Sequence, residues 1–334
     1  MKSNIFSTFK SLTYKESDNN SFYVSPLENM HHKIGISREG FPIFFIKTDL
    51  YTDVYSQNLH REILSVEYNV SCTINEMGTA TQDACFSIIT LRTTEQDLQS
   101  YFFDIFFLML KKLNPIPTNK ELSLEVENLI SIFSAMSRKP LKKIQGLWAE
   151  LLVIERSKRP EILIQAWHNS PGAKYDFTLG KDKIEVKSTS SENRTHRFSL
   201  DQLNPSLNSR LVIASCKVRE SAQNENNGFS LTNLFDRICQ RISSIDLRIK
   251  LYSIIAETLG INFKEKDNIY FDYTEASDSL AFFDAKDVPH INKDLIPKLV
   301  SEVKFQSDLS HLIDIFDSSS KFDKNNSELF NSLI

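Results

Sequence analysis

Hydrophobic and polar residues along the first hundred positions mostly follow the pattern of β-strands. Residues 33–36 and 41–46 are rich in apolar side chains and flank a polar turn at 37–40 that contains a glycine. Two apolar runs around such a turn are typical of a β-hairpin. Residues 86–91 carry β-branched and aromatic side chains and predict another strand. We therefore expect residues 22–95 to be mainly β-structure.

The pattern becomes helical after this region. Over residues 95–113 apolar side chains recur every three or four positions, which predicts an amphipathic helix that two following prolines end. Thr118 and Glu121 then have the spacing of a capping box, and they predict a second helix that continues to about residue 137. We expect residues 1–117 to form an N-terminal α+β domain, mostly β and then one helix.

The middle of the chain alternates between helix and strand patterns. Residues 141–157 have a helical apolar face. Residues 175–179 and 183–187 flank a turn with Gly180, which predicts a second hairpin, and residues 211–216 form an apolar run suited to a buried strand. This order predicts an α/β fold with a central mixed β-sheet flanked by helices.

The last third of the chain is expected to be mainly helical at first. Residues 230–242 and 244–259 have helical periodicity. We therefore predict that a second domain, with a helical extension, covers residues 118–317. Residues 318–334 are rich in serine, asparagine and lysine, and are predicted to be a flexible tail.

Composition excludes several classes of protein. The 334 residues are 41% hydrophobic and 25% charged, as in ordinary globular proteins. No apolar run is long enough for a membrane span, and the N-terminus has no signal-peptide core. The four cysteines show no CxxC spacing, and neither a P-loop nor an HExxH motif is present. We expect a cytoplasmic protein without membrane contact, whose ATP-derived energy, if any, comes from a partner ATPase.

Charge is distributed unevenly along the chain. The net charge is −4, but residues 138–219 contain 16 Lys and Arg against 8 Asp and Glu, a balance of +8. The rest of the chain therefore carries −12. A basic segment inside an acidic chain indicates a localised anionic ligand, and a solvated basic face is the alternative.

Three charged residues form a candidate catalytic group. Asp176 is followed by Glu185 nine residues later and by Lys187 eleven residues later. Residues two apart on a strand point the same way, so Glu185 and Lys187 should project together, and the hairpin can bring Asp176 beside them. Two carboxylates can hold Mg²⁺, with Mn²⁺ as a substitute. A lysine beside them can act on a water molecule and stabilise a phosphoryl transition state.

The acid-x-lysine spacing alone is a weak signal. The composition predicts about five such triplets by chance, and the chain has three, including a second Glu-Val-Lys at residues 302–304. That second copy has no preceding hairpin that bears an aspartate, so it serves as an internal control. The alternative for Glu185 and Lys187 is a solvent-facing pair on an amphipathic strand.

Glu150 adds a third carboxylate. It lies on the predicted helix in line with Leu147, Leu151 and Ile154, on the apolar face. A carboxylate among apolar residues needs a cation or a metal, because an unpaired buried charge is costly. The helix could pack on the sheet and point Glu150 toward the hairpin. The alternative is a residue at the flank of the helix whose carboxylate reaches water.

This order of residues resembles the PD-(D/E)XK nuclease superfamily, which has the restriction-endonuclease-like fold. It is most similar to a prokaryotic family of PD-(D/E)XK motif proteins encoded near phage-defence and restriction genes. Five segments carry the resemblance: residues 146–152, Trp167, residues 175–177, residues 184–189 and residues 201–203. Tyr175 replaces the proline of the superfamily name, and Ala149 replaces an expected glycine.

The resemblance implies roles for four residues. Asp176 and Glu185 would be metal ligands, Lys187 the catalytic lysine, and Glu150 an accessory acid and metal ligand. The implied activity is Mg²⁺-dependent DNA endonuclease cleavage in restriction or antiphage defence, with DNA as partner. A homodimer is an option because cutting both strands requires two sites, and other defence proteins are expected partners.

Further residues are candidate DNA contacts, each with an ordinary structural or surface role as the alternative. They are Gln202, Ser188, Arg194, Arg197, Lys142 and Lys143. His168, which follows Trp167 in a loop-like segment, is interpreted as structural. Two rival functions stay open: a nuclease of repair, recombination or RNA, and a non-catalytic DNA-binding subunit of a defence complex.

Overall fold

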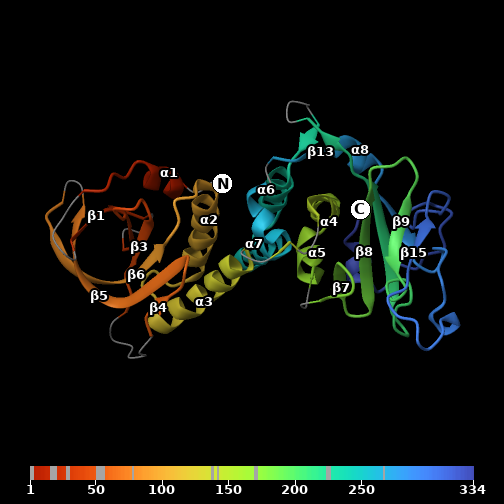
Figure 1. Cartoon of the computed structure of the whole chain (residues 1–334), viewed down its shortest axis with the longest axis horizontal. Helices are drawn as coiled ribbons and strands as arrows, with labels where there is room; N and C mark the ends of the chain where they lie inside the picture. Colours follow the sequence, from red (N-terminus) through yellow and green to blue (C-terminus); the bar gives the residue numbers. More distant parts are fainter. Residues whose placement is uncertain are drawn as a thin grey trace. The chain divides into compact units, whose positions relative to one another are not determined.

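A computed structural model describes most of the chain as two compact units, Met1–Ser137 and Arg138–Ile334. Figure 1 shows the elements of each unit. The residues described are 4–15, 21–27, 31–49, 57–76, 79–136, 139–140, 143–168, 172–222, 227–265 and 268–334. Among them, no helix is long and apolar enough to cross a membrane.

The first unit is built around one β-sheet. Its strands are β1 (Ser21–Pro26), β2 (Lys33–Ile36), β3 (Pro42–Ile46), β4 (Leu59–His60), β5 (Leu64–Glu76) and β6 (Gln82–Leu91). They follow the order β1-β2-β3-β6-β5-β4, and β1 also pairs in parallel with β5, so that the sheet closes on itself. The antiparallel pairing of β2 with β3 confirms the predicted first hairpin.

Helices cover the outside of this sheet. They are α1 (Asn4–Lys10), α2 (Gln96–Lys112) and α3 (Asn119–Met136). The Phe44 ring of β3 lies 4.2 Å from that of Phe106 in α2, between ring centroids. Thr118 and Glu121 form the expected reciprocal cap of α3, because the backbone N–H of each residue donates to the side chain of the other.

The sequence assigned the α3 segment to the second domain, with a boundary after residue 117. The structure groups α3 with the first unit, one helix beyond that boundary. The reason is packing: the Phe133 ring of α3 packs against the rings of Phe102 and Tyr101 in α2, with ring centroids 5.3 and 6.2 Å apart. The pattern of α3 showed an apolar face but did not show which partner would cover it.

The second unit contains the motif residues. Its helices are α4 (Ile144–Arg156), α5 (Pro160–Ala166), α6 (Leu231–Arg241), α7 (Ile245–Leu259), α8 (Tyr273–Asp278) and α9 (Glu328–Asn331), with 3₁₀ turns η1 (Gly260–Glu265) and η2 (Lys293–Leu295). Its strands are β7 (Phe177–Leu179), β8 (Asp182–Thr189), β9 (Thr195–Ser199), β10 (Arg210–Lys217), β11 (Glu220–Ser221), β12 (Gly228–Phe229), β13 (Tyr270–Asp272), β14 (Ala281–Asp284) and β15 (Lys304–Asp308).

The central sheet of this unit is mixed, as the sequence predicted. Its order is β14-β10-β8-β7; β8 runs parallel to β10, while β7 and β14 are antiparallel to their neighbours. Figure 1 shows α4 and α5 on one side of β8 and the β9–β15 pair on the other. The pairing of β7 with β8 confirms the predicted second hairpin. The fold is therefore a mixed α/β arrangement.

Both sides of β8 are lined by apolar residues. On the β9 side, Phe198, Ile213 and Leu309 belong to one buried cluster. Helix α4 packs on β8 and presents fully buried Leu147 and Leu151. Because both faces of the sheet are covered, side chains beside the edge strand β7 lie among apolar neighbours. An ionised side chain there needs hydrogen-bond or ionic partners to offset its desolvation.

The predicted flexible tail is instead ordered and packed. Leu329, Phe330 and Leu333 are buried, and α9 contacts β8 and α5. Asp182, at the start of β8, accepts hydrogen bonds from Ser327 Oγ at 2.6 Å and from Nε and Nη2 of Arg210. The polar residues before position 328 led to the prediction of a flexible tail. The short apolar segment that follows them packs against the sheet instead.

Candidate active site

Asp176 lies immediately before β7, where the chain enters the hairpin. Its carboxylate oxygen Oδ2 accepts the backbone N–H of Val186 at 2.8 Å, and only 6% of the residue is exposed. Val186 separates Glu185 from Lys187 on β8. Asp176 therefore contacts the backbone between Glu185 and Lys187, and the pairing of Phe177 with Ile184 sets this register.

Glu150 lies on α4 and is 2% exposed, so its carboxylate does not reach water as the alternative interpretation required. Its Oε2 accepts the indole N–H of Trp167 at 2.8 Å and lies 2.9 Å from Nε2 of His168. Trp167 is fully buried and pairs through a β-bridge with Phe177. The bridge therefore connects the end of α5 to the start of β7 and brings the Trp-His pair to Glu150.

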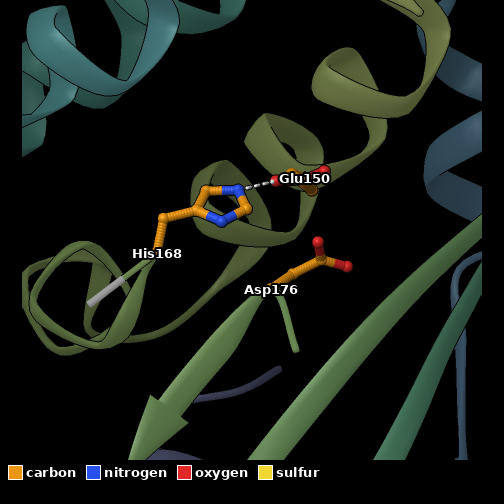
Figure 2. A group of neighbouring side chains, drawn as sticks. All are labelled: Glu150, His168 and Asp176. Carbon is orange, nitrogen blue, oxygen red and sulfur yellow. Dashed lines mark hydrogen bonds and ion pairs between the residues drawn. The ribbon is translucent and has the colours of Figure 1, made fainter. Parts of the chain in front are cut away.

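Glu150, His168 and Asp176 form a compact group, which we call the carboxylate–histidine group. Each offers a ligand atom, and these atoms all lie within 4.8 Å of one another. Figure 2 shows the three side chains converging from α4, from the segment after α5 and from the residue before β7. The backbone also links them, because the N–H of His168 donates to the carbonyl of Asp176 at 2.9 Å.

Glu185, Lys187 and Gln202 form a second group, which we call the lysine group. Lys187 Nζ lies 2.7 Å from Glu185 Oε1, and the amide nitrogen of Gln202 donates to the same oxygen at 2.6 Å. Glu185 is 4% exposed, and 17% of the Lys187 side chain is exposed. The alternative of a solvent-facing pair is therefore not what the structure shows.

The orientation of Gln202 follows from its partners. Its Oε1 accepts the backbone N–H of Ser199 at 3.1 Å, and a backbone N–H can only donate. The amide nitrogen must then face Glu185. Lys187 Nζ is 3.4 Å from the same Oε1 and 5.1 Å from the centroid of the Phe198 ring. Gln202 thus holds both members of the ion pair from one side.

The carboxylate–histidine group fits a divalent cation. Carboxylate oxygens are the ligands that hard divalent cations prefer. Glu150 and Asp176 are both buried, and two ionised carboxylates this close repel each other unless positive charge lies between or beside them. Glu185 is not a member of this group, so the structure places His168 where the sequence analysis expected a further carboxylate.

Two neighbouring groups are held neutral by their surroundings. Burial raises the pKa of the Tyr175 phenol well above its usual range, and the nearby Glu185 and Asp201 carboxylates add to the effect. Tyr175 donates its hydroxyl to the carbonyl of Gln202 at 3.2 Å. Burial, together with the charge of Lys187, lowers the pKa of His196 to about 4.

A shallow hollow lies beside the lysine group. Its volume is about 350 Å³, and its lining residues come from β9, β15 and the turn after β9: Arg197, Phe198, Ser199, Gln202 and Lys304. Arg197 and Lys304 are exposed. Two cations therefore border an opening that leads to Gln202, an arrangement that suits an anionic ligand.

The other candidate contacts have different surroundings. The guanidinium of Arg194 donates to both the carbonyl and the hydroxyl of Ser215 and to the carbonyl of Ser279, so it braces β10 rather than facing solvent. Ser188 follows Lys187 on β8 and projects to the opposite face. Lys143 is exposed just before α4. Lys142 lies outside the described residues.

His168 is the residue that the sequence interpretation underrated. The sequence predicts a structural role for it, because a lone histidine in a loop-like segment is usually structural. The signal that could have found it is the Trp-His pair directly after a short helix and eight residues before Asp176. The β-bridge that uses this spacing is a tertiary feature, and local periodicity does not reveal it.

Comparison with known protein families matches residues 6–310 of the chain. The matching family is described as "Putative PD-(D/E)XK family member, (DUF4420)". Members of the PD-(D/E)XK superfamily are mostly nucleases and generally use divalent metal ions. Comparisons with curated proteins and with solved structures gave no match. The resemblance seen in the sequence is confirmed over nearly the whole chain, and the chain belongs to this PD-(D/E)XK family.

Proposed function

We propose that the protein is a divalent-metal-dependent nuclease that hydrolyses phosphodiester bonds in DNA. The observation that supports this most directly is the contact between Asp176 and the peptide that joins Glu185 to Lys187. It places the Asp176 carboxylate against the backbone between the two residues of the Glu-x-Lys pair. Asp176 also belongs to the carboxylate–histidine group, together with Glu150 and His168.

The carboxylates are the groups that would hold the metal. Asp176 is fixed by the Val186 N–H and Glu150 by the Trp167 indole, so both carboxylates are oriented in advance by neutral donors. A bound divalent ion would lower the pKa of a coordinated water and stabilise negative charge on a phosphoryl oxygen. Mg²⁺, which the sequence suggests, is one ion suited to oxygen ligands of this type.

Lys187 is the group that would act on the attacking water. Its ammonium is held by Glu185 and Gln202, and part of the side chain is open to solvent. An ammonium held in place can orient a water molecule and stabilise the charge that develops on phosphate in the transition state. Glu185 would hold the Lys187 side chain in position until substrate arrives.

DNA is the proposed substrate because of the charge beside the lysine group. Arg197 and Lys304 border the hollow next to Gln202, and two exposed cations there suit backbone phosphates. The segment from 138 to 219 that carries +8 contributes Arg197. A role in restriction or antiphage defence, a homodimer and partner defence proteins are further proposals from the sequence resemblance.

The test is cleavage of supercoiled plasmid by the purified full-length protein with Mg²⁺ or Mn²⁺. We expect nicked or linear product with wild type, and loss of product with Lys187→Ala and with Asp176→Ala. A parallel reaction with RNA separates the two substrates. Cleavage that persists in both variants would exclude the proposed site.

The non-catalytic alternative predicts a different result. A protein of that kind binds DNA in a mobility-shift assay but leaves the plasmid intact under every metal condition. Binding that survives in Lys187→Ala while cleavage is absent in the wild type would therefore favour a DNA-binding subunit. Cleavage of RNA alone would favour the rival RNA nuclease.

A further inference from the structure

We propose that His168 is a nitrogen ligand of the metal ion held by Glu150 and Asp176, and that the site therefore prefers a transition-metal ion such as Mn²⁺ to Mg²⁺. The proposal rests on the proposed function, because it takes a metal ion at this site as given. It changes the expected ligand set from carboxylates alone to two carboxylates and one imidazole.

The position of the imidazole is the first argument. Nε2 of His168 lies 2.9 Å from Oε2 of Glu150, and a ligand atom of Asp176 lies within 4.8 Å of both side chains. Ligands at adjacent corners of an octahedron with bonds of about 2.1 Å are about 3 Å apart. The separation between nitrogen and oxygen is therefore that of two ligands on one ion, and it equally fits a hydrogen bond.

The surroundings of Glu150 favour the ligand role. Trp167 already donates to the same Oε2 at 2.8 Å, so Glu150 has a fixed neutral donor without the histidine. Glu150 and Asp176 bring two buried carboxylates to the group, and a divalent ion would balance their charge. Figure 2 shows the ring beside both carboxylates, within the space where they converge.

The choice of ion follows from the donor atoms. Mg²⁺ is a hard cation that binds oxygen ligands and keeps several waters. Imidazole is a common ligand of first-row transition ions, which bind nitrogen more strongly than Mg²⁺ does. A site of two carboxylate oxygens and one imidazole nitrogen should therefore bind Mn²⁺ more tightly than Mg²⁺.

The experiment uses Mn²⁺ alone as the probe with the full chain. Mn²⁺ binding is followed by the loss of its free-ion electron paramagnetic resonance signal, and Mg²⁺ is added as competitor. Pulsed measurements on the bound ion then report whether a nitrogen nucleus is directly coordinated. We expect nitrogen modulation in the wild type. In His168→Asn the modulation should disappear and the preference for Mn²⁺ over Mg²⁺ should fall at least tenfold.

Trp167→Phe is the matched control variant. It removes the other donor to Glu150 Oε2 but takes away no ligand, so the bound Mn²⁺ should keep its nitrogen modulation. Circular dichroism establishes that each variant is folded, and the wild-type spectrum is decisive even where a variant is not. If His168 served only to hold Glu150, the two variants would weaken Mn²⁺ binding alike.

Three results would overturn the proposal in distinguishable ways. Bound Mn²⁺ without nitrogen modulation in the wild type would remove His168 from the ligand set and leave the proposed nuclease function intact. Nitrogen modulation that persists in His168→Asn would assign the nitrogen to another residue. A wild-type protein that binds no Mn²⁺ at millimolar concentration would contradict both this inference and the proposed function.

Discussion

The tripeptide Glu-Val-Lys occurs twice in the second unit, and the two copies have contrasting surroundings. Glu185 and Lys187 lie on an interior strand, and their charged atoms are 2.7 Å apart. Glu302 and Lys304 are both exposed, and Glu302 has a backbone φ of 56°, outside the extended region. The same three residues therefore form an ion pair within the sheet at one site and an exposed bend that leads into β15 at the other.

The difference comes from neighbours far away in sequence. The hairpin brings Asp176 to the backbone N–H between Glu185 and Lys187. The turn after β9 brings the amide of Gln202 to Glu185. Lys304 instead begins β15, which pairs only with β9 among the described strands. A short motif thus indicates chemistry only when its surroundings bury it and supply partners, and the two copies serve as matched positions for experiments.

The largest expected effect is on catalysis. Lys187→Ala should reduce kcat for plasmid cleavage by at least about 100-fold, because a positioned acid-base or charge-stabilising group contributes that much. Lys304→Ala should act mainly on KM and on the salt dependence of binding, since Lys304 borders the hollow. Equal losses of kcat in the two variants would contradict a catalytic role that belongs to Lys187 and not to Lys304.

The next largest difference between the two Glu-Val-Lys copies should be in the free energy of unfolding. Lys187→Met leaves Glu185, which is 4% exposed, without its lysine and should lower the free energy of unfolding by about 2 kcal/mol. Lys304→Met should change it by less than about 0.5 kcal/mol, as expected for an exposed side chain. Urea unfolding with a chelator present measures both. A Lys187→Met protein as stable as wild type would show that the ion pair does not support the fold.

The backbone at Glu302 offers a smaller effect of opposite sign. A residue with a side chain at φ 56° is strained, and glycine is not. Glu302→Gly should therefore raise the free energy of unfolding by about 0.5 kcal/mol, after the greater entropy of glycine in the unfolded chain is subtracted. Glu302→Ala should give no gain, because its Cβ remains. Thermal denaturation of the two variants makes the comparison.

The smallest expected effect is on His196, which lies in β9 and donates to or accepts from Ser215 Oγ at 2.7 Å. Burial lowers its pKa from 6.5 to about 4, and the charge of Lys187 contributes. The pKa should rise in Lys187→Met but stay below 6.5, because burial is the larger cause. It should not change in Lys304→Met. Nuclear magnetic resonance titration of the imidazole protons tests both statements.

The same pKa fixes the sign of a pH effect on stability. Because His196 binds its proton more weakly in the folded state than in the unfolded state, unfolding takes up a proton between pH 6.5 and about 4. Stability from this group is therefore complete above pH 6.5 and declines as the pH falls toward 4. In Lys187→Met, where the folded pKa is higher, the decline attributable to His196 should be smaller.

Much of the fold could be predicted because its signals are local. The capping box at Thr118 and the glycine turns of both hairpins specify structure within a few residues, and these elements are confirmed. The pairing of β9 with β15 was not predicted, because Phe198 and Phe305 are brought together over about a hundred residues. Nothing in either segment specifies its partner or its register.

The candidate site could be predicted to a similar extent. Asp176 directly precedes the hairpin that carries Glu185 and Lys187, so its contact with the backbone between them follows from strand pairing. Glu150 required the further assumption that α4 packs on the sheet, and it does. The membership of His168 depends on the bridge between Trp167 and Phe177, and that of Gln202 on a turn beyond β9. Such contacts arise from tertiary packing and have no periodic signature.

The packed segment after residue 326 has a consequence for folding during synthesis. Asp182, which begins the strand bearing Glu185 and Lys187, receives the Ser327 hydroxyl, and Phe330 lies under the Arg210 guanidinium 5.1 Å away. These contacts form only after residue 330 has left the ribosome, well after the hairpin itself has emerged. The nascent chain therefore exposes β7 and β8 before these supports exist, and the contacts at Asp182 and Arg210 are completed only when residues 327–330 have emerged.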